Sequence, residues 1–506
     1  MLSAEMKTVN AATSHLDGVA VNASTGAERA HAPHFSIPNL VFENRTRLDA
    51  AQFDMVDQYG SSFHVVVAKT AYSLGAHDAT GMAPLIALSP AAKLNVEDLH
   101  FDDDSNASVR HESDFAPYKP ACDVIVNATA HAPRGKPTSA FRVRLAVQPA
   151  PPEPSEGATG HATPPKSARA PLIDKTLSIT GERNFKKKIA LLRLLQWGVK
   201  VVTFGVLRPN PWRLALADDT AQIPLRYEFA NGGQCRIDED DGAAKRVPTN
   251  ARLPRDEAAT NNAYANVARP VAHESSDANP LGRGFTRRWY LDASDIKTMA
   301  APRISAEWRP CTALQFWRAA HGEALPDPVG LGIVGRGWLP RRALAGTFDA
   351  NATYANDDVP NLPEDFDFAY YNCAPRDQQC PYLRGEESFT LLNLCRPDHP
   401  SATSDANGNA VLRFSLPMQA LFLLAVDGCD DLMIERMVID TVIVEPDEGR
   451  VELTWRALLP TDCDLRVARL MQVTEAAQIA RVRQLEQLQA SQIAAHAKAA
   501  AQGPAR

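Results

Sequence analysis

The chain has 506 residues, with 53 basic and 60 acidic side chains and a net charge of −7, and is long enough to bury a large core. Because neither sign of charge is strongly in excess, the composition argues against a general nucleic-acid-binding protein, whose affinity rests on a concentrated positive field. Thirty-seven prolines and only 22% charged residues favour many turns and short elements over long helices.

The N-terminal residues 1–34 are polar and rich in small side chains, so we expect them to be disordered. They contain no apolar stretch of the kind found in a secretory signal, which predicts a cytoplasmic protein. The eight cysteines should then be reduced thiols, and none of them forms the close pair typical of a zinc site. We therefore expect neither a metal nor another cofactor.

From residue 35 onward the chain is rich in predicted β-strands. Their β-branched and aromatic content is typical of buried strands, and residues 141–147 alternate with a period of two. The predicted strands are 63–72, 121–126, 141–147, 175–179, 411–414, 440–444 and 451–456, the last two joined by a short acidic turn. The sequence therefore predicts a mainly β fold.

Two polar stretches divide the strand-rich region. Residues 148–170 are rich in Pro, Glu, Gly, Ala and Ser and predict a flexible linker, whereas residues 234–277 predict a surface insertion. We expect two packed β-sandwich-like units, 35–147 and 171–460, with long ordered loops. One large β domain with insertions is the alternative.

One apolar stretch, residues 189–207, follows Lys186–Lys188. Arg193, Gln196 and Lys200 interrupt it, so a membrane-spanning helix is not expected. We predict a partly buried helix or an insertion, with a helix on a membrane surface as the alternative.

The C-terminal part, residues 461–506, differs in kind. It has no glycine or proline before residue 503 and is dominated by Ala, Gln, Arg and Leu, which predicts a C-terminal α-helix and tail. Its larger apolar residues step by three, at Ile479, Val482, Leu485 and Leu488, so the apolar stripe drifts around the helix. We expect a partly frayed, solvated helix, and a partner-contacting or coiled-coil role is the alternative.

The densest run of special residues lies between Trp338 and Gly385. Aromatic residues alternate there with Asp, Pro and Gly, which predicts a long ordered loop system, and loops of this length are usually functional. Its structural motif comprises Gly346, Asp349, Asp365, Phe366, Asp367 and Gln378. Our candidates for contact with a protein partner are Trp338, Arg341, Arg342, Tyr370 and Tyr371, because aromatic residues and Arg are enriched at binding hot spots.

Enzyme signatures are weak. Residues 330–335 match the dinucleotide-binding pattern by letter, but they do not follow a strand or open a helix. Asp349, Asp365 and Asp367 could in principle serve acid–base hydrolysis, yet such residues are more often turn caps or partners of Arg. If Asp365 or Asp349 is buried, its replacement by Ala should cost about 1–3 kcal/mol of stability.

Several motifs together resemble one known family, the domain of unknown function 2169 family. They occur in the family's order, at residues 112–124, 130–133, 227–233, 279–284, 338–379, 440–441 and 455–456. The resemblance covers roughly residues 35–460. It implies an adaptor or chaperone of bacterial type VI secretion rather than a catalyst.

The same resemblance implies the partners. Such adaptors bind an effector that carries a PAAR-type tip or a related N-terminal region, and help to load it onto the VgrG spike. Neither nucleic acid nor stable insertion into a membrane is expected. The alternatives are a structural component of the secretion apparatus and a hydrolase that uses the loop carboxylates.

Overall fold

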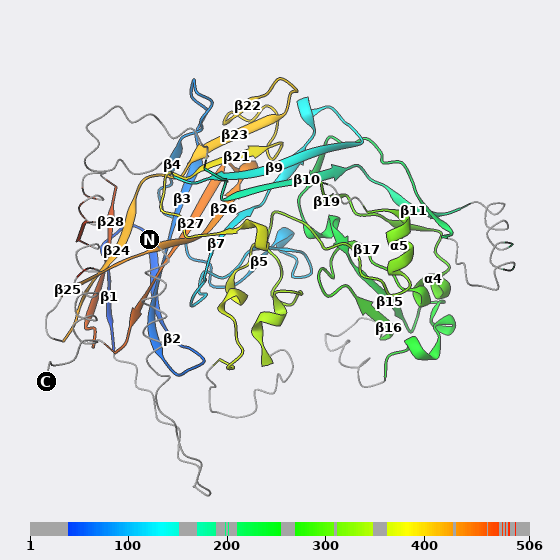
Figure 1. Cartoon of the computed structure of the whole chain (residues 1–506), viewed down its shortest axis with the longest axis horizontal. Helices are drawn as coiled ribbons and strands as arrows, with labels where there is room; N and C mark the ends of the chain where they lie inside the picture. The colour runs from blue at the N-terminus through cyan, green and yellow to red at the C-terminus, as the bar shows by residue number, and fades with distance from the viewer. Residues whose placement is uncertain are drawn as a thin grey trace, which may run out of the picture. The chain divides into compact units, whose positions relative to one another are not determined.

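The fold described by the computed structural model lies within residues 38–506. The described stretches are 39–150, 169–188, 210–254, 269–307, 311–347, 362–428, 432–462 and 464–474, together with a few isolated positions. The fold is mainly β, as the sequence predicts, and two α-helices are present in these stretches, α4 (Arg288–Ser294) and α5 (Ala313–Ala319) (Figure 1). The expected disordered N-terminus lies outside the described residues.

The largest sheet has seven strands drawn from both ends of the chain (Figure 1). Its order is β2 (Asp49–Val56), β3 (Ser62–Leu74), β27 (Arg450–Pro460), β26 (Val438–Glu445), β7 (Cys122–Val126) and β20 (Gln379–Cys380), with β4 (Leu85–Ala87) paired to β3. All of its pairs are antiparallel except β26 with β7. Residues 446–448, between β26 and β27, form the predicted acidic turn.

Two further sheets complete the main body. The six-stranded sheet has the order β19 (Ile304–Ala306), β10 (Ile173–Thr180), β9 (Ala140–Gln148), β21 (Ser388–Leu392), β23 (Ala410–Ser415) and β22 (Ala402–Ser404). The four-stranded sheet has the order β1 (Val41–Asn44), β28 (Val467–Val473), β24 (Ala420–Val426) and β25 (Leu432–Arg436). Each predicted strand therefore has a counterpart in one of these sheets.

Smaller sheets carry the segment between β10 and the loop system, together with short strands within residues 99–111 and 129–131. A three-stranded sheet has the order β12 (Trp212–Leu214), β11 (Asn184–Lys187) and β18 (Thr298–Ala300). The two-stranded sheets are β13 (Gln222–Pro224) with β8 (Thr129–His131), β14 (Asn231–Gly232) with β17 (Arg283–Gly284), β15 (Gln234–Asp238) with β16 (Pro270–Ser275), and β5 (Leu99–His100) with β6 (Val109–His111).

The two faces of the seven-stranded sheet differ in chemistry, because successive side chains of a strand point to opposite sides. One side, the core face, carries Val66, Val124, Leu453 and other apolar residues of the main hydrophobic core, to which the six- and four-stranded sheets also contribute. The other side, the loop face, carries one continuous row of polar residues. Its members lie directly opposite one another across four strands and are Lys69, Thr454, Thr441 and Asp123.

The expected boundary at residues 148–170 does not separate two folding units. Strands β9 and β10, which flank it, pair along eight residues in the six-stranded sheet, and β3 and β7 pair with β27 and β26 from the far end of the chain. Hydrogen bonding between strands depends on their proximity in space, so sequence order does not reveal it. Residues 151–168 of the linker lie outside the described part.

The predicted C-terminal helix is wrong in its first part. Residues Val467–Val473 form β28, which pairs with both β1 and β24 and buries Ala468 and Leu470 in the main core. Most residues after Thr474 lie outside the described part, as does most of the apolar stretch 189–207. No helix in the described stretches is long and apolar enough to cross a membrane.

The two ends of the expected surface insertion pair with each other as strands. Strand β15 pairs antiparallel with β16, and Ile237, Val247 and Ala272 are buried in a small core beside α4. The insertion therefore carries apolar packing of its own, although residues 255–268 within it are not among the described ones.

Candidate functional site

The loop system predicted between Trp338 and Gly385 lies against the loop face of the seven-stranded sheet. Ile125 of β7 and Ile443 of β26 are buried there with Ile333, Cys373 and Ala374 of the loops. Three short 3₁₀ helices shape the described part of the loops: Arg342–Ala345, Phe368–Tyr371 and Arg376–Gln378. This loop system thus covers part of the loop face of the sheet.

Asp123 of β7 anchors these loops. Its fully buried carboxylate accepts hydrogen bonds from the backbone amides of Cys373 (3.0 Å) and Ala374 (3.1 Å) and from the side chain of Asn372 (3.1 Å). The ammonium group of Lys119 donates to the same carboxylate at 2.9 Å. Because four nitrogen donors converge on one buried anion, this contact fixes the loop to the sheet.

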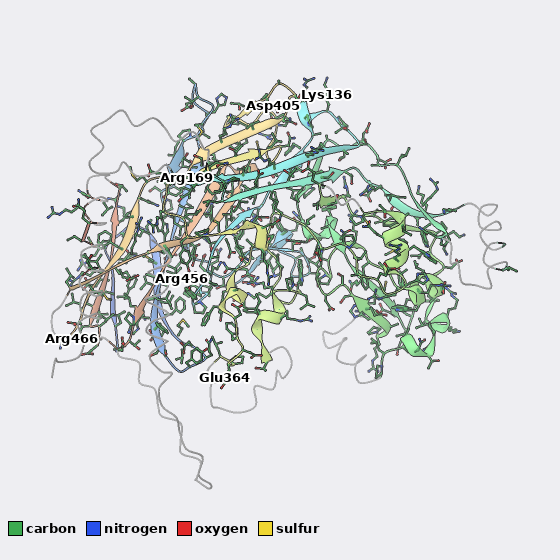
Figure 2. All side chains as sticks on the ribbon, viewed as in Figure 1. Lys136, Arg169, Glu364, Asp405, Arg456 and Arg466 are labelled. Atoms are coloured by element: carbon green, nitrogen blue, oxygen red, sulfur yellow. The ribbon has the colours of Figure 1, made fainter. Side chains whose placement is uncertain are left out.

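A chain of buried polar contacts continues from Asp123 across the loop face. Lys119 also donates to the Thr441 hydroxyl at 2.9 Å, and that hydroxyl donates to Asp440 at 2.9 Å. Asp440 accepts at 2.5 Å from Arg456, which projects from β27 and is labelled in Figure 2 (Figure 2). Three motif residues noted at the C-terminal end of the resemblance, Asp440, Thr441 and Arg456, thus meet here.

The far end of the buried chain is centred on Lys69 of β3. Its ammonium group lies 2.9 Å from Asp114 and 3.1 Å from Glu452, and all three side chains are buried. Asp114 also accepts from Thr454 at 2.9 Å, and its carbonyl accepts from Arg456 at 3.1 Å. We call the whole set, from Lys69 to Asp123, the buried ionic network.

The sequence reasoning missed Lys69 and Glu452, although a signal for Lys69 is present. A lysine inside an otherwise apolar strand needs a carboxylate partner, because an unpaired charge is rarely buried. The identity of that partner is not readable from the strand itself, since Asp114 lies 45 residues and Glu452 more than 380 residues further along the chain.

The sequence led us to expect Arg341 to be an exposed contact residue. The structure shows otherwise, because the side chain of Arg341 is only 4% exposed. Its guanidinium group donates to both carboxylate oxygens of Glu112, at 2.5 and 2.9 Å, and to the carbonyl oxygens of Val334 and Tyr370, each at 2.7 Å. Burial alone would raise the pKa of Glu112, but Arg341 outweighs it and holds that pKa below its usual value of 4.5. Arg341 is therefore an internal clamp between two parts of the loop system.

Two carboxylates of the structural loop motif, Asp365 and Asp367, lie at the solvent. Gly346 has a φ of +62°, and a Cβ there would lie 2.5 Å from a carboxylate oxygen of Asp365. Asp365 accepts from the amide and the hydroxyl of Thr347, both at 3.0 Å, and Asp367 caps a 3₁₀ helix through the amide of Ala369 at 2.8 Å. Both carboxylates are exposed, and Asp349 lies outside the described residues.

Gln378 is the fully buried member of that motif. Its amide group donates to the carbonyl oxygens of Val124 (2.7 Å) and Leu331 (2.9 Å), and its oxygen accepts from Lys175 at 2.8 Å. It therefore joins β7, β10 and the loop system through one side chain.

Five aromatic rings, which we call the aromatic cluster, pack together next to the Arg341 clamp. Phe366 is buried and packs edge-on against Phe368 and Tyr370, with ring centroids 5.4 and 5.7 Å away, and Tyr118 packs against Phe368 at 5.6 Å. Tyr371 completes the cluster, 5.6 Å from Tyr370. All except Phe366 are half-buried, so the cluster has a solvent-facing side.

The other two interface candidates occupy different surroundings. Trp338 is half-buried and packs edge-on against the buried ring of Tyr227, 5.2 Å away. Arg342 is half-buried and donates to the carbonyl oxygen of Gly337 at 3.3 Å. Tyr370 and Tyr371 are therefore the two interface candidates that belong to the aromatic cluster.

Two further motifs, at 227–233 and 279–284, form one tight junction. The fully buried side chain of Asn279 donates to the carbonyl oxygens of Tyr227 and Asn231, each at 2.9 Å, and the strands β14 and β17 pair beside it. Gly232 has a φ of +141°, and a Cβ there would lie 2.1 Å from the carbonyl oxygen of Asn279. Only glycine fits this approach of two chain segments.

The electrostatics of the buried ionic network favour a fixed scaffold. Burial and the neighbouring Asp123 raise the pKa of the Cys373 thiol well above its ordinary value, which disfavours a reactive thiolate. Burial alone would lower the pKa of Lys119, yet the carboxylates of Asp123 and Asp440 raise it overall, so the lysine stays charged. Among the described residues, no group of His, Cys, Asp and Glu side chains is arranged to hold a metal ion.

Comparison with known proteins gives one finding. No curated protein and no solved structure matches the chain. A family described as "Uncharacterized protein conserved in bacteria (DUF2169)" matches residues 60–456, a stretch that includes the buried ionic network, the aromatic cluster and the junction at Asn279. Since this match spans well over half of the sequence, the chain belongs to the DUF2169 family of bacterial proteins.

Proposed function

We propose that this protein is an adaptor of bacterial type VI secretion. In this role it binds an effector with a PAAR-type tip or a related N-terminal region and helps to load it onto the VgrG spike. Family membership over residues 60–456 supports the proposal, because the motifs of the chain resemble those of such adaptors.

The observation that carries the proposal is the aromatic cluster on its rigid support. Half-buried Tyr and Phe rings offer large contact areas that lose little side-chain entropy on binding, and they are enriched in protein interfaces. Here Tyr370 is held from below, since Arg341 binds its carbonyl oxygen at 2.7 Å and places its guanidinium group 5.6 Å from the ring centroid. We assign the effector-binding surface to this cluster.

The exposed loop carboxylates do not favour the hydrolase alternative. The hydrogen bond from the Thr347 amide holds the pKa of Asp365 below its usual range, whereas a general acid needs a raised pKa. Asp367 is engaged as a helix cap.

The test is coexpression of the intact chain with a PAAR-bearing effector from the same bacterium. We expect the chain to raise the soluble yield of the effector, and the double variant Tyr370→Ser/Tyr371→Ser to lose most of this effect. Tyr59→Ser is the matched control, because Tyr59 is 66% exposed in the turn between β2 and β3. A chelator should not reverse the effect.

Deletion of the gene should abolish delivery of the effector while the apparatus still secretes its tube protein. Loss of tube secretion would point instead to a structural component of the apparatus. Turnover of a polysaccharide or peptide by the purified chain, abolished by Asp365→Asn, would favour a hydrolase. Unchanged solubility with the double Tyr variant would contradict the assignment of the surface to the aromatic cluster.

A further inference from the structure

The lysine at one end of the buried ionic network has two carboxylates within contact distance. The side chain of Lys69 is 1% exposed, and its Nζ lies 2.9 Å from Oδ2 of Asp114 and 3.1 Å from Oε2 of Glu452. The side chains of both carboxylates are buried as well. An amine, a carboxyl group and a second carboxylate therefore meet in a place from which bulk water is largely excluded.

Hydrogen bonds on all sides hold Asp114 in position. Its backbone amide donates to the carbonyl oxygen of Asn95 at 2.9 Å, and its own carbonyl oxygen accepts from Arg456 at 3.1 Å. In the side chain, Oδ1 accepts from the Thr454 hydroxyl at 2.9 Å and Oδ2 accepts from the Asn95 amide at 2.7 Å. The carboxyl carbon Cγ is thereby fixed beside the lysine amine, and donors on both oxygens polarise it.

Glu452 presents an oxygen whose hydrogen bonding is incomplete. Its Oε1 forms an ion pair with Arg450. Its Oε2 is buried, and no donor among the described residues is aligned for a hydrogen bond with it, although Nζ of Lys69 lies 3.1 Å away and Nδ1 of His111 lies 3.8 Å away. Buried polar atoms nearly always have a partner, so this exception points to a role. A carboxylate oxygen beside an ammonium group is suited to accept a proton from it.

The energetics of the site favour removal of its charges. An ion pair in the interior is costly, because both ions leave water. Joining Lys69 and Asp114 in an amide removes one positive and one negative charge from the interior, and the amide oxygen can keep the hydrogen bond from Thr454. The fixed geometry favours the reaction, because two groups held together react as if each were present at a very high concentration.

We propose that the amine of Lys69 and the side-chain carboxyl group of Asp114 condense to an amide in the folded chain, with Glu452 as the catalytic base. Glu452 accepts a proton from the ammonium group, and the free amine attacks Cγ of Asp114. A bond forms between Nζ and Cγ, and the bond between Cγ and Oδ2 breaks. The departing oxygen keeps the electron pair of that bond, takes up two protons from Nζ, one of them through Glu452, and leaves as water. No oxidant, metal ion or other reactant takes part.

The amide links strand β3 to the family motif at residues 112–124. It closes a covalent loop of residues 69–114, which includes the sheet formed by β5 and β6. Because Thr454 and Glu452 belong to β27, the site is complete only when β27 has paired with β3. The bond therefore forms after folding and then locks the arrangement in which it formed.

Two other buried lysines are internal controls. Lys119 lies 2.9 Å from Asp123, but its further hydrogen bonds go to a hydroxyl and a thiol and not to a second carboxylate. Lys175 lies 2.6 Å from Asp377, whose side chain is 61% exposed, so water surrounds that carboxylate. Neither pair has all the parts of the site, and we expect both to stay ionic.

Mass spectrometry of the purified full chain tests the bond without any variant. We expect a mass lower than that of the sequence by one molecule of water. After complete denaturation, trypsin should cut after Lys175 but not after Lys69. It should release a branched product that joins residues 48–93 to residues 111–134, and the second of these stretches, which contains Lys119 and Asp123, should have lost no further water.

Variants separate the nucleophile from the base. Lys69→Arg keeps the positive charge but lacks the amine, so this chain should have the full mass of its sequence. Glu452→Gln keeps the shape of the side chain but cannot accept the proton, and its bond should form at least about 100-fold more slowly. Glu445→Gln is the matched control, because Glu445 is also a buried carboxylate of the sheet but pairs with Arg110 and His111. It should form the bond as the unchanged chain does.

Three outcomes would overturn the proposal. A chain that has its full sequence mass and is cut after Lys69 would show that the pair stays ionic. Loss of one water without the branched product would place the dehydration at another residue. A bond that forms equally fast in Glu452→Gln would remove Glu452 from the reaction.

Discussion

At the residue scale, Asp123 is the side chain on which the loop system depends most. It is fully buried and accepts from four nitrogen donors, whereas Asp365, which the sequence analysis favoured, is exposed and accepts from Thr347 alone among the hydrogen bonds described above. Asp123→Ala leaves the charge of Lys119 buried without its main partner and should cost about 3–5 kcal/mol. Asp365→Ala should cost less than about 1 kcal/mol.

Urea unfolding of both variants, followed by intrinsic fluorescence, checks this difference. If Asp365→Ala lowered the free energy of unfolding as much as Asp123→Ala, the sequence-based view, in which the exposed motif carboxylates hold the loops, would be restored. Comparable stability of Asp123→Ala and the unchanged protein would mean that the loop face does not need its anchor.

The Glu112–Arg341 pair makes stability depend on pH in a defined direction. Since the folded-state pKa of Glu112 lies below its unfolded value of 4.5, the pair contributes stability above about pH 4.5 and loses it as the pH falls through the folded-state pKa. The free energy of unfolding should therefore decrease below pH 4.5.

The variant Glu112→Gln isolates this contribution. It should be less stable than the unchanged protein at pH 7, and the difference between the two should shrink as the pH falls below 4.5. Denaturant titrations at several pH values measure this, and a constant difference across that range would contradict the assignment to Glu112.

At the scale of elements, each of the seven strands predicted from the sequence has a counterpart, but many shorter strands were not predicted and β28 was predicted as a helix. The run 63–72 is found because β-branched and aromatic residues crowd it, and burial of β3 on both faces explains that composition. In β28, Ala468, Arg469, Leu470 and Met471 favour a helix by intrinsic propensity, and the helix-forming residues that follow extend the pattern. Pairing with β1 and β24 overrides that preference.

The candidate site, like the strands, can be predicted from the sequence only in part. Composition suffices to predict an ordered aromatic loop system, and Tyr370 and Tyr371 do lie in a half-exposed cluster. It cannot show that Arg341 points inward, because the side of a loop that faces the protein is set by contacts such as Glu112, 229 residues earlier in the chain.

The place of β28 changes where the C-terminus can be shortened. A chain that ends at Thr474 keeps β28 and should retain the β body, whereas a chain that ends at Arg466 removes the strand between β1 and β24. We expect the shorter chain to be insoluble or to unfold without cooperativity, because Ala468 and Leu470 are fully buried. Circular dichroism during heating measures both, and a well-folded chain that ends at Arg466 would contradict the role of β28.

At the scale of the whole molecule, the strands before and after residues 148–170 belong to the same sheets. A protease cut within residues 151–168 should therefore leave two fragments that remain together through β9 with β10 and through β3 with β27. Gel filtration without denaturant checks this expectation. Separation of the fragments under native conditions would favour a boundary between two units at these residues, as the sequence suggested.

The pairing of β3 with β27 also constrains how the protein is made. Strand β3 is complete when residue 74 leaves the ribosome, but its neighbour begins at residue 450. At about 5–20 residues per second, translation of the intervening chain takes roughly 20–80 s. During this time the largely apolar run from Val65 to Tyr72 has one sheet neighbour fewer than in the folded protein, so each newly made molecule must avoid aggregation until residue 460, at the end of β27, has been synthesised.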